Sequence, residues 1–224
     1  VVVVAVPDHL HYPVIRQALA HGQHVLAVKP LVLKHAQAIE IEQTARERGL
    51  FVGVEYHKRF DRRSLEARLQ YRRGRFGQFR CGEAKLVEPY YYRHSNFQNW
   101  FTRENSDPFT YIGCHYVDLV HFITGATYPE SAVCLGGTFT WKDEHHFTAP
   151  DQVHALWNYP EGVMVSYTTN FGNASGNVLK IYGEEGVIDL TNWVAPTYSG
   201  AGAIKSSKLS GKDQPVAPVE TPDH

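Results

Sequence analysis

The sequence predicts an α/β protein: the second half of a doubly wound (Rossmann-type) parallel sheet, followed by an α+β domain with a mostly antiparallel open sheet. Three observations predict this. Valine-rich runs alternate with helical segments up to about residue 57. The periodicity then changes after residue 60. Short runs separated by turns fill much of the chain beyond residue 125, as in an antiparallel sheet.

The first segment reads as strand, helix, strand, helix, strand. Its strands are expected at three valine-rich runs, as strands buried on both faces require: Val1–Val6, His24–Val28 and Leu50–Tyr56. The helices between them are expected at His11–His21 and Lys34–Arg48, and a glycine follows each. This order implies parallel pairing with right-handed crossovers. Residues 1–60 are therefore predicted to be the C-terminal half of a dinucleotide-binding domain.

The second segment, residues 61–224, is predicted to be an α+β domain, because strands follow a helical opening. Helices are expected at Asp61–Arg73 and Tyr116–Thr124, with a strand at Gln78–Val87 between them. Five further strands are expected at Ser131–Thr140, Asp151–Tyr159, Gly162–Asn170, Val178–Tyr182 and Gly186–Leu190. The tail from Thr197, rich in Gly, Ser, Lys and Pro, is expected to be a loop.

Composition excludes several classes of protein. Of 224 residues, 43% are hydrophobic and 20% charged, with a net charge of −1, so nothing favours nucleic acid or an anionic membrane as partner. No apolar run approaches the about 18 residues that span a bilayer. Three cysteines without a C-x-x-C spacing predict free thiols and a cytoplasmic protein. Because the chain begins within a strand and without methionine, we expect a further segment before Val1.

Polar residues follow all three parallel strands. Asp8, His9 and His11 come after the first strand, Lys29 after the second, and Tyr56 with His57 at the end of the third. Ligands bind outside the carboxyl ends of such strands, so these side chains should face one cleft. A polar strand end is by itself commonly just solvated, but the convergence of three ends favours a site.

Other chemistries find weaker support. His9 and His11 form an H-x-H on a turn, but no third ligand is in register, so no metal site is predicted. The arginine-rich stretch 59–80 is interpreted as a solvated helix face, because acidic and apolar residues interrupt it. G-x-S-x-G and G-x-G-x-x-G are both absent from the sequence.

A second constellation is YIGCHYVDLVHF, residues 111–122. A helix that begins near Gly113 places His115 in its first turn, where the helix dipole favours the neutral imidazole. A neutral imidazole can act as a general base. The alternative is a histidine that caps the helix or borders the core.

The motifs VVVVAVPDHLH, HVLAVKP, VEYHKRF and GCHYVDL, in this order, resemble the Gfo/Idh/MocA family, the glucose–fructose oxidoreductase and inositol dehydrogenase-like enzymes. The resemblance implies NAD or NADP as cofactor. It also implies that the first half of the dinucleotide fold, with its glycine fingerprint, is absent from this chain. The family's open sheet often makes oligomer contacts, so a homodimer or homotetramer through the antiparallel sheet is expected.

Carried over by position, the resemblance assigns roles to individual residues. Lys29 matches the lysine of the family's Glu-Lys-Pro, but Val28 replaces the glutamate. His115 matches the histidine of Asp-x-x-x-His, and Tyr111 replaces the aspartate. The implied cofactor-binding residues are Pro7, Asp8, His9, His11, Lys29, Pro30, Tyr56 and His57.

The implied activity is an NAD(P)-dependent dehydrogenase that acts on a CH–OH group of a sugar, polyol or related small molecule. Its catalytic residues would be Lys29, His115 and Tyr111. Its substrate-binding residues would be Lys29, Arg93, Asn96, Trp100, Tyr111 and His115. Because two family carboxylates are missing, a dinucleotide-binding sensor or scaffold without catalysis is the alternative. An interaction module built on the antiparallel sheet alone is the third hypothesis.

Overall fold

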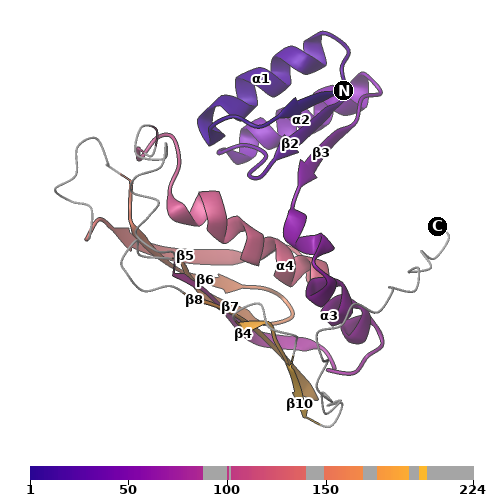
Figure 1. The fold of residues 1–224 in the computed structure, drawn as a ribbon, viewed down its shortest axis with the longest axis vertical. Coiled ribbons are helices and arrows are strands. Elements are labelled where there is room, and N and C mark those ends of the chain that lie inside the picture. The colour runs from indigo at the N-terminus through magenta and orange to yellow at the C-terminus, as the bar shows by residue number, and fades with distance from the viewer. Residues whose placement is uncertain (88–99, 101, 140–148, 169–175, 192–196, 201–224) are drawn as a thin grey trace, which may run out of the picture.

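The computed structural model describes residues 1–87, 100, 102–139, 149–168, 176–191 and 197–200. A three-stranded sheet and a seven-stranded sheet organise this part of the chain (Figure 1). The 3-10 turn η1 (His57–Phe60) and helix α3 (Arg62–Arg72) lead from the small sheet to the large one. Helix α4 (Cys114–Thr124) lies with α3 along one face of the large sheet.

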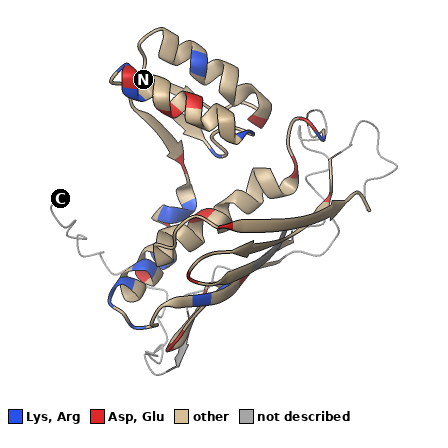
Figure 2. Cartoon of the chain, turned by 180° about the vertical axis from the view of Figure 1, so that it is seen from behind, with Lys and Arg blue, Asp and Glu red and all other residues tan. Residues whose placement is uncertain are grey.

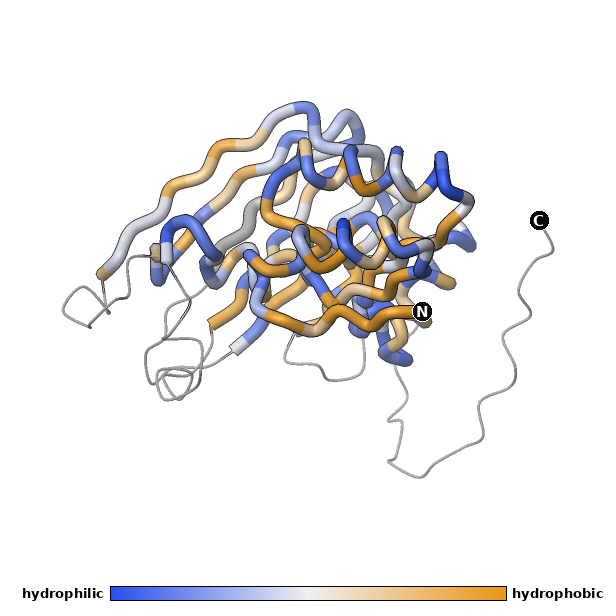
Figure 3. The backbone as a smooth tube through the Cα atoms, turned by 90° about the horizontal axis from the view of Figure 1, so that it is seen from above, coloured by the Kyte–Doolittle hydropathy of each residue, from blue (hydrophilic) through white to orange (hydrophobic). Residues whose placement is uncertain are grey.

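The small sheet confirms the predicted parallel order. It consists of β1 (Val2–Val4), β2 (Val25–Val28) and β3 (Val52–Glu55), in the spatial order β1-β2-β3 with both pairs parallel. The intervening helices are α1 (Asp8–Ala20) and α2 (His35–Glu47). Figure 3 shows the hydrophobic character of the N-terminal strand.

Burial in the small sheet differs from the expectation of strands covered on both faces. Val25 and Ala27 are fully buried in a cluster with apolar side chains of α1 and α2. Residues at the alternate strand positions face the other side of the sheet: Leu26 of β2 is 39% exposed and Val3 of β1 is 65% exposed. Helices α1 and α2 thus cover one face of this sheet, because successive strand residues point to opposite sides.

The large sheet is mostly antiparallel, as predicted, with one parallel pair. Its order is β10-β9-β8-β4-β7-β6-β5, and only β4 and β7 among these neighbours run parallel. The strands are β4 (Phe79–Val87), β5 (Ser131–Gly137), β6 (Gln152–Asn158), β7 (Val163–Thr168), β8 (Gly176–Gly183), β9 (Gly186–Asp189) and β10 (Thr197–Gly200). The expectation of a loop from Thr197 is therefore wrong for its first four residues, which pair with β9. Backbone pairing explains this difference, since it requires no apolar alternation.

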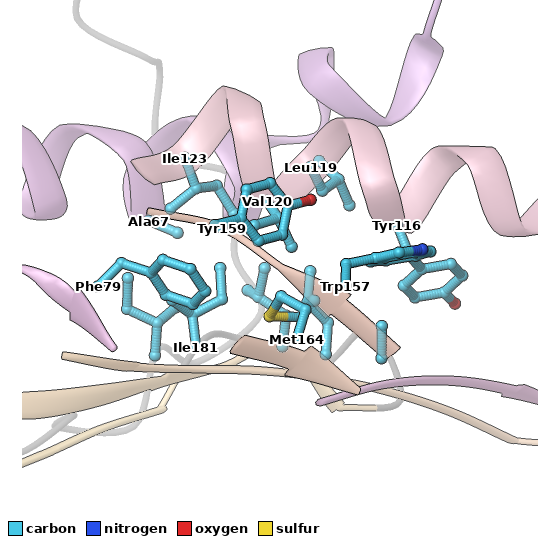
Figure 4. Close-up of a cluster of buried hydrophobic side chains, with 14 of the residues drawn as sticks. Ala67, Phe79, Tyr116, Leu119, Val120, Ile123, Trp157, Tyr159, Met164 and Ile181 are labelled. Atoms are coloured by element: carbon cyan, nitrogen blue, oxygen red, sulfur yellow. The ribbon is translucent and has the colours of Figure 1, made fainter. Parts of the chain in front are cut away.

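The main core lies between α4 and the large sheet. Leu119, Val120 and Ile123 of α4 are almost completely buried and face Trp157 and Met164 of the sheet (Figure 4). Burying each such aliphatic side chain contributes roughly 1.5–3 kcal/mol. This packing fixes the rotation of α4 about its axis, and with it the direction of every side chain in the helix.

Two helix starts bear on the site. Helix α1 begins at Asp8, three residues before the expected start, so Asp8, His9 and His11 lie in its first turns and not on a loop. Helix α4 begins at Cys114 and follows a π-helical turn, η4 (Phe109–Gly113), which no sequence pattern indicated. It ends at Gly125, whose φ of 69° is the left-handed conformation that glycine adopts without strain.

The arginine-rich stretch has the mixed-charge character that was predicted. Figure 2 shows basic residues on η1 and α3 interspersed with acidic ones. Arg63 pairs with Asp61, the N-cap of α3, and Arg80 pairs with Glu184. Within the described residues, no helix combines the length and hydropathy needed to cross a bilayer.

Candidate active site

Lys29 connects the two sheets. It directly follows β2, and its Nζ donates a hydrogen bond to the backbone carbonyl of Tyr111 in η4, 82 residues later. The ammonium also lies over the Tyr111 ring, 3.4 Å from the ring centroid, within the range of a cation–π interaction. The carboxyl end of β2 and the turn η4 before α4 are therefore in direct contact.

Two acidic residues influence the charge of Lys29. Burial lowers the pKa of Lys29, and negative charge on Cys114, Asp8 and Glu55 opposes this shift. Burial also raises the pKa of the Cys114 thiol to about 12, so this thiol is uncharged near pH 7. Asp8 and Glu55 are therefore the groups that favour the charged ammonium.

Asp8 is itself buried, with 3% of its surface exposed. Its carboxylate accepts a hydrogen bond of 2.5 Å from the Ser106 hydroxyl. Burial raises the pKa of Asp8, and the Ser106 hydrogen bond and the charge on Lys29 oppose the rise. The hydroxyl and the ammonium thus replace part of the hydration that this carboxylate loses on folding.

His115 lies in the first turn of α4, as predicted, and is 3% exposed. Burial lowers its pKa to about 3, and the positive charges of Lys29, His57 and Lys58 add to this effect. The imidazole is therefore neutral at physiological pH, with burial and not the expected helix dipole as the main cause. Its Nδ1 atom has no hydrogen-bond partner among the described residues. Such a ring can accept a proton.

Tyr56 and His57, which follow β3, lie beside His115. The His57 and His115 rings meet edge to face with centroids 4.6 Å apart, and the Tyr56 ring lies 6.0 Å from His115. Arg59 holds η1 against α4, because its Nε donates to both carboxylate oxygens of Asp118 at 3.0 and 2.8 Å.

An aromatic group borders the site on the α1 side. Trp100 lies 6.2 Å from the His9 ring and 5.8 Å from the Tyr111 ring, measured between centroids. The Nδ1 atom of His9 is buried and has no hydrogen-bond partner within the described part of the chain. Arg93 and Asn96, the other expected substrate residues, lie outside the described residues.

His11 lies elsewhere than expected. It is fully buried, with Nδ1 2.7 Å from the Pro30 carbonyl and Nε2 2.9 Å from the Val6 carbonyl. Both ring nitrogens are thus engaged by the backbone, and the ring braces the segment after β2 instead of facing the cleft. Pro30 is buried with it, and Pro7, just before α1, is partly exposed.

No cluster of three potential metal ligands occurs among the described residues. A broad apolar groove lies between α2 and β3, lined by residues that include Ile39, Phe51 and Tyr128, and none of the predicted site residues borders it.

Comparison with known proteins identifies the family. Residues 64–189 match the family described as the GFO/IDH/MocA C-terminal domain, and residues 1–56 match the oxidoreductase family with an NAD-binding Rossmann fold. The chain belongs to the Gfo/Idh/MocA family. NAD is the cofactor of the Rossmann fold to which its first 56 residues belong.

The alignments with individual relatives include a larger share of this chain than of the relative. D-glucoside 3-dehydrogenase of Escherichia coli is 28% identical over 56% of the chain and 36% of the enzyme. Trans-1,2-dihydrobenzene-1,2-diol dehydrogenase of the mouse is 26% identical over 84% of the chain and 54% of the enzyme. The chain thus spans about half the length, or less, of these curated relatives.

A solved structure shows the same fold. It is an inositol dehydrogenase homologue from Azotobacter vinelandii, complexed with NADH and myo-inositol. Its TM-score is 0.77 at 19% identity, over 90% of the present chain and 54% of that chain.

The residues of this Gfo/Idh/MocA chain fit a nicotinamide cofactor at the carboxyl ends of its strands. A buried ring nitrogen of His9 and another of His115 have no partner among the described residues, and a polar ligand would satisfy them. Lys29, between them in the chain, is half-buried and provides a donor at the same edge of the sheet.

Two residues near the site, Glu55 and Ser106, were not identified from the sequence. Glu55 is paired with Val28 in the parallel register of β2 and β3. Val28 is the position at which the family pattern has its glutamate. Glu55 also directly precedes Tyr56 at the end of β3. The predicted parallel pairing of these two strands could have identified Glu55 from the sequence. Ser106 follows no motif, and only the contact with Asp8, 98 residues away, reveals it.

Proposed function

We propose that the protein is an NAD(P)-dependent dehydrogenase that interconverts a CH–OH group and a carbonyl in a sugar, polyol or related small molecule. The observation that carries this proposal is the pairing of a half-buried Lys29 ammonium with a buried, neutral His115 at the carboxyl end of a parallel sheet. In this proposal residues 1–60 form the cofactor part and residues 61–224 the substrate and oligomerisation part.

The roles follow from the state of each side chain. His115, neutral because it is buried, takes the proton of the substrate hydroxyl on a ring nitrogen. Lys29 donates a hydrogen bond to the same oxygen as negative charge develops there. When bound, NAD or NADP supplies the two-electron oxidant for the substrate carbon. Tyr111 orients Lys29 through its backbone carbonyl and ring, and in this proposal its hydroxyl contacts a substrate hydroxyl.

The substrate would lie between these groups and Trp100, with Arg93 and Asn96 as further polar contacts. Aromatic faces and polar groups together suit the apolar and hydroxyl-bearing faces of a sugar ring. The related D-glucoside 3-dehydrogenase supports this substrate class.

Assembly and location are part of the same proposal. Val133 and Leu135 of β5 and Leu156 of β6 are 63%, 73% and 44% exposed on the large sheet, which supports a homodimer or homotetramer through it. The three free cysteines support a cytoplasmic protein.

The test is turnover by the full-length protein on a panel of sugars and polyols with NAD and with NADP. With an active substrate, Lys29→Met and His115→Phe should each lower kcat/KM at least about 100-fold. Lys34→Met, an exposed lysine just before α2, is the matched control and should leave it unchanged. Undiminished turnover by Lys29→Met would refute the role given to this residue.

The second candidate is a dinucleotide-binding sensor or scaffold, which the absence of acidic groups at Val28 and Tyr111 favours. Binding of NADH or NADPH without turnover on the whole panel would support it over the dehydrogenase. A protein that binds neither dinucleotide at full length would instead support the interaction module.

A further inference from the structure

A base as buried as His115 needs a route by which its proton leaves. The side chain is 3% exposed, and burial lowers its pKa to about 3. An imidazolium in this position is therefore unfavourable and has to pass its proton on before the next turnover. Lys29, the other residue assigned a direct role at the substrate oxygen, is already a donor to Tyr111 and has no free acceptor capacity as an ammonium.

His57 occupies the position between His115 and solvent. Its ring lies edge to face against the His115 ring at a centroid distance of 4.6 Å. Its side chain is 59% exposed. One imidazole thus touches the buried base on one side and water on the other.

Glu55 lies beside this ring. Its Oε1 lies 3.4 Å from the His57 Nδ1, and its side chain is 33% exposed. With Nδ1 beside the carboxylate, Nε2 is the nitrogen that remains for proton exchange. The Arg59–Asp118 pair holds the backbone of η1 against α4 and keeps the two rings together.

We propose that His57 carries the proton of His115 to solvent and that Glu55 is the positioning residue for this transfer. The inference rests on the proposed function, in which His115 receives that proton from the substrate hydroxyl. An N–H bond of the His115 imidazolium breaks, a new N–H bond forms on His57, and the proton then passes to a water molecule. No electrons are transferred, and both rings return to their neutral forms.

The charges around the two rings favour this direction. Positive charge on Lys29, His57 and Lys58 disfavours a second proton on His115, whereas the Glu55 carboxylate lies beside His57, 3.4 Å from its Nδ1. Tyr56, whose pKa burial raises, stays protonated and cannot act as the acceptor. Asp118 of α4 is occupied by Arg59.

The first test needs neither cofactor nor substrate. In the full-length protein, nitrogen-15 NMR measures the exchange with water of the imidazole N–H proton of His115. We expect exchange to slow about 10-fold in His57→Gln, which has a similar size but cannot carry a proton, and less in Glu55→Gln. His35→Gln, at an exposed histidine of α2, is the control and should leave exchange unchanged.

The second test uses the substrate that the activity panel identifies. We expect kcat to fall at least about 10-fold in His57→Ala and added imidazole to restore much of it, since the truncated side chain leaves room for the buffer base. A residue that merely supports the fold would show no such rescue.

The outcomes separate the two proposals. Unchanged His115 exchange in His57→Gln, or a His57→Ala variant with full kcat, would overturn the relay and leave the dehydrogenase proposal intact. Slowed exchange in a protein that turns over no substrate would establish the proton route and refute the dehydrogenase.

Discussion

Glu55 lies beside Val28 in the register of the small parallel sheet, one strand away from the position where the family pattern places a glutamate. The neighbouring strand thus supplies a carboxylate opposite Val28, where the family pattern has one in the chain. With Asp8, this carboxylate offsets the lowering of the Lys29 pKa that burial causes.

Stability should depend on pH through His115. Its pKa is about 3 in the folded protein and 6.5 when unperturbed, so the unfolded state binds more protons between these values. Stability is therefore retained above pH 6.5 and lost as the pH falls toward 3, by about 1.4 kcal/mol per pH unit. Urea unfolding at several pH values should show a shallower acid loss in His115→Phe than in the wild type. Equal slopes in both proteins would mean that His115 is not buried as a neutral ring.

Asp8→Asn should raise the stability of the fold and lower the pKa of Lys29. Burial raises the pKa of Asp8, so burying the ionised carboxylate costs stability, and a neutral amide should raise the melting temperature. Loss of the carboxylate also removes charge that keeps Lys29 protonated. The alkaline limb of the pH–rate profile should therefore move to lower pH, by about 0.5–1 unit. Glu47→Gln, at an exposed position of α2, is the control for both measurements. A lower melting temperature with an unmoved alkaline limb would contradict this account of Asp8.

The Arg59–Asp118 pair should contribute more stability than an exposed pair. The side chain of Asp118 is 7% exposed and that of Arg59 42%. Asp118→Asn leaves a partly buried guanidinium without its anion and should cost about 1–3 kcal/mol, allowing for solvent screening at Arg59. Glu42→Gln breaks the Arg46–Glu42 pair, whose side chains are 79% and 67% exposed, and should cost less than about 0.5 kcal/mol. Chemical denaturation compares the two, and equal losses would show that burial of the pair is unimportant.

The sequence by itself determined the local elements and the strand ends. Valine-rich runs and glycine stops located β1, β2, β3 and their helices to within a few residues, because each signal depends on neighbours in the chain. The same patterns placed Lys29, Tyr56 and His57 at strand ends and His115 in the first turn of a helix. The turn η4 and strand β10 were missed, since neither has a distinct periodicity.

Only the tertiary structure decided which of these residues meet. His11 shares the sequence context of Asp8 and His9, yet its ring points inward to two backbone carbonyls. The contacts of Lys29 with Tyr111, of Asp8 with Ser106 and of His57 with His115 join segments of chain that lie far apart. They depend on how α4 packs on the large sheet and how η1 is held against it. Packing of this kind involves many residues at once, and no single stretch of sequence encodes it.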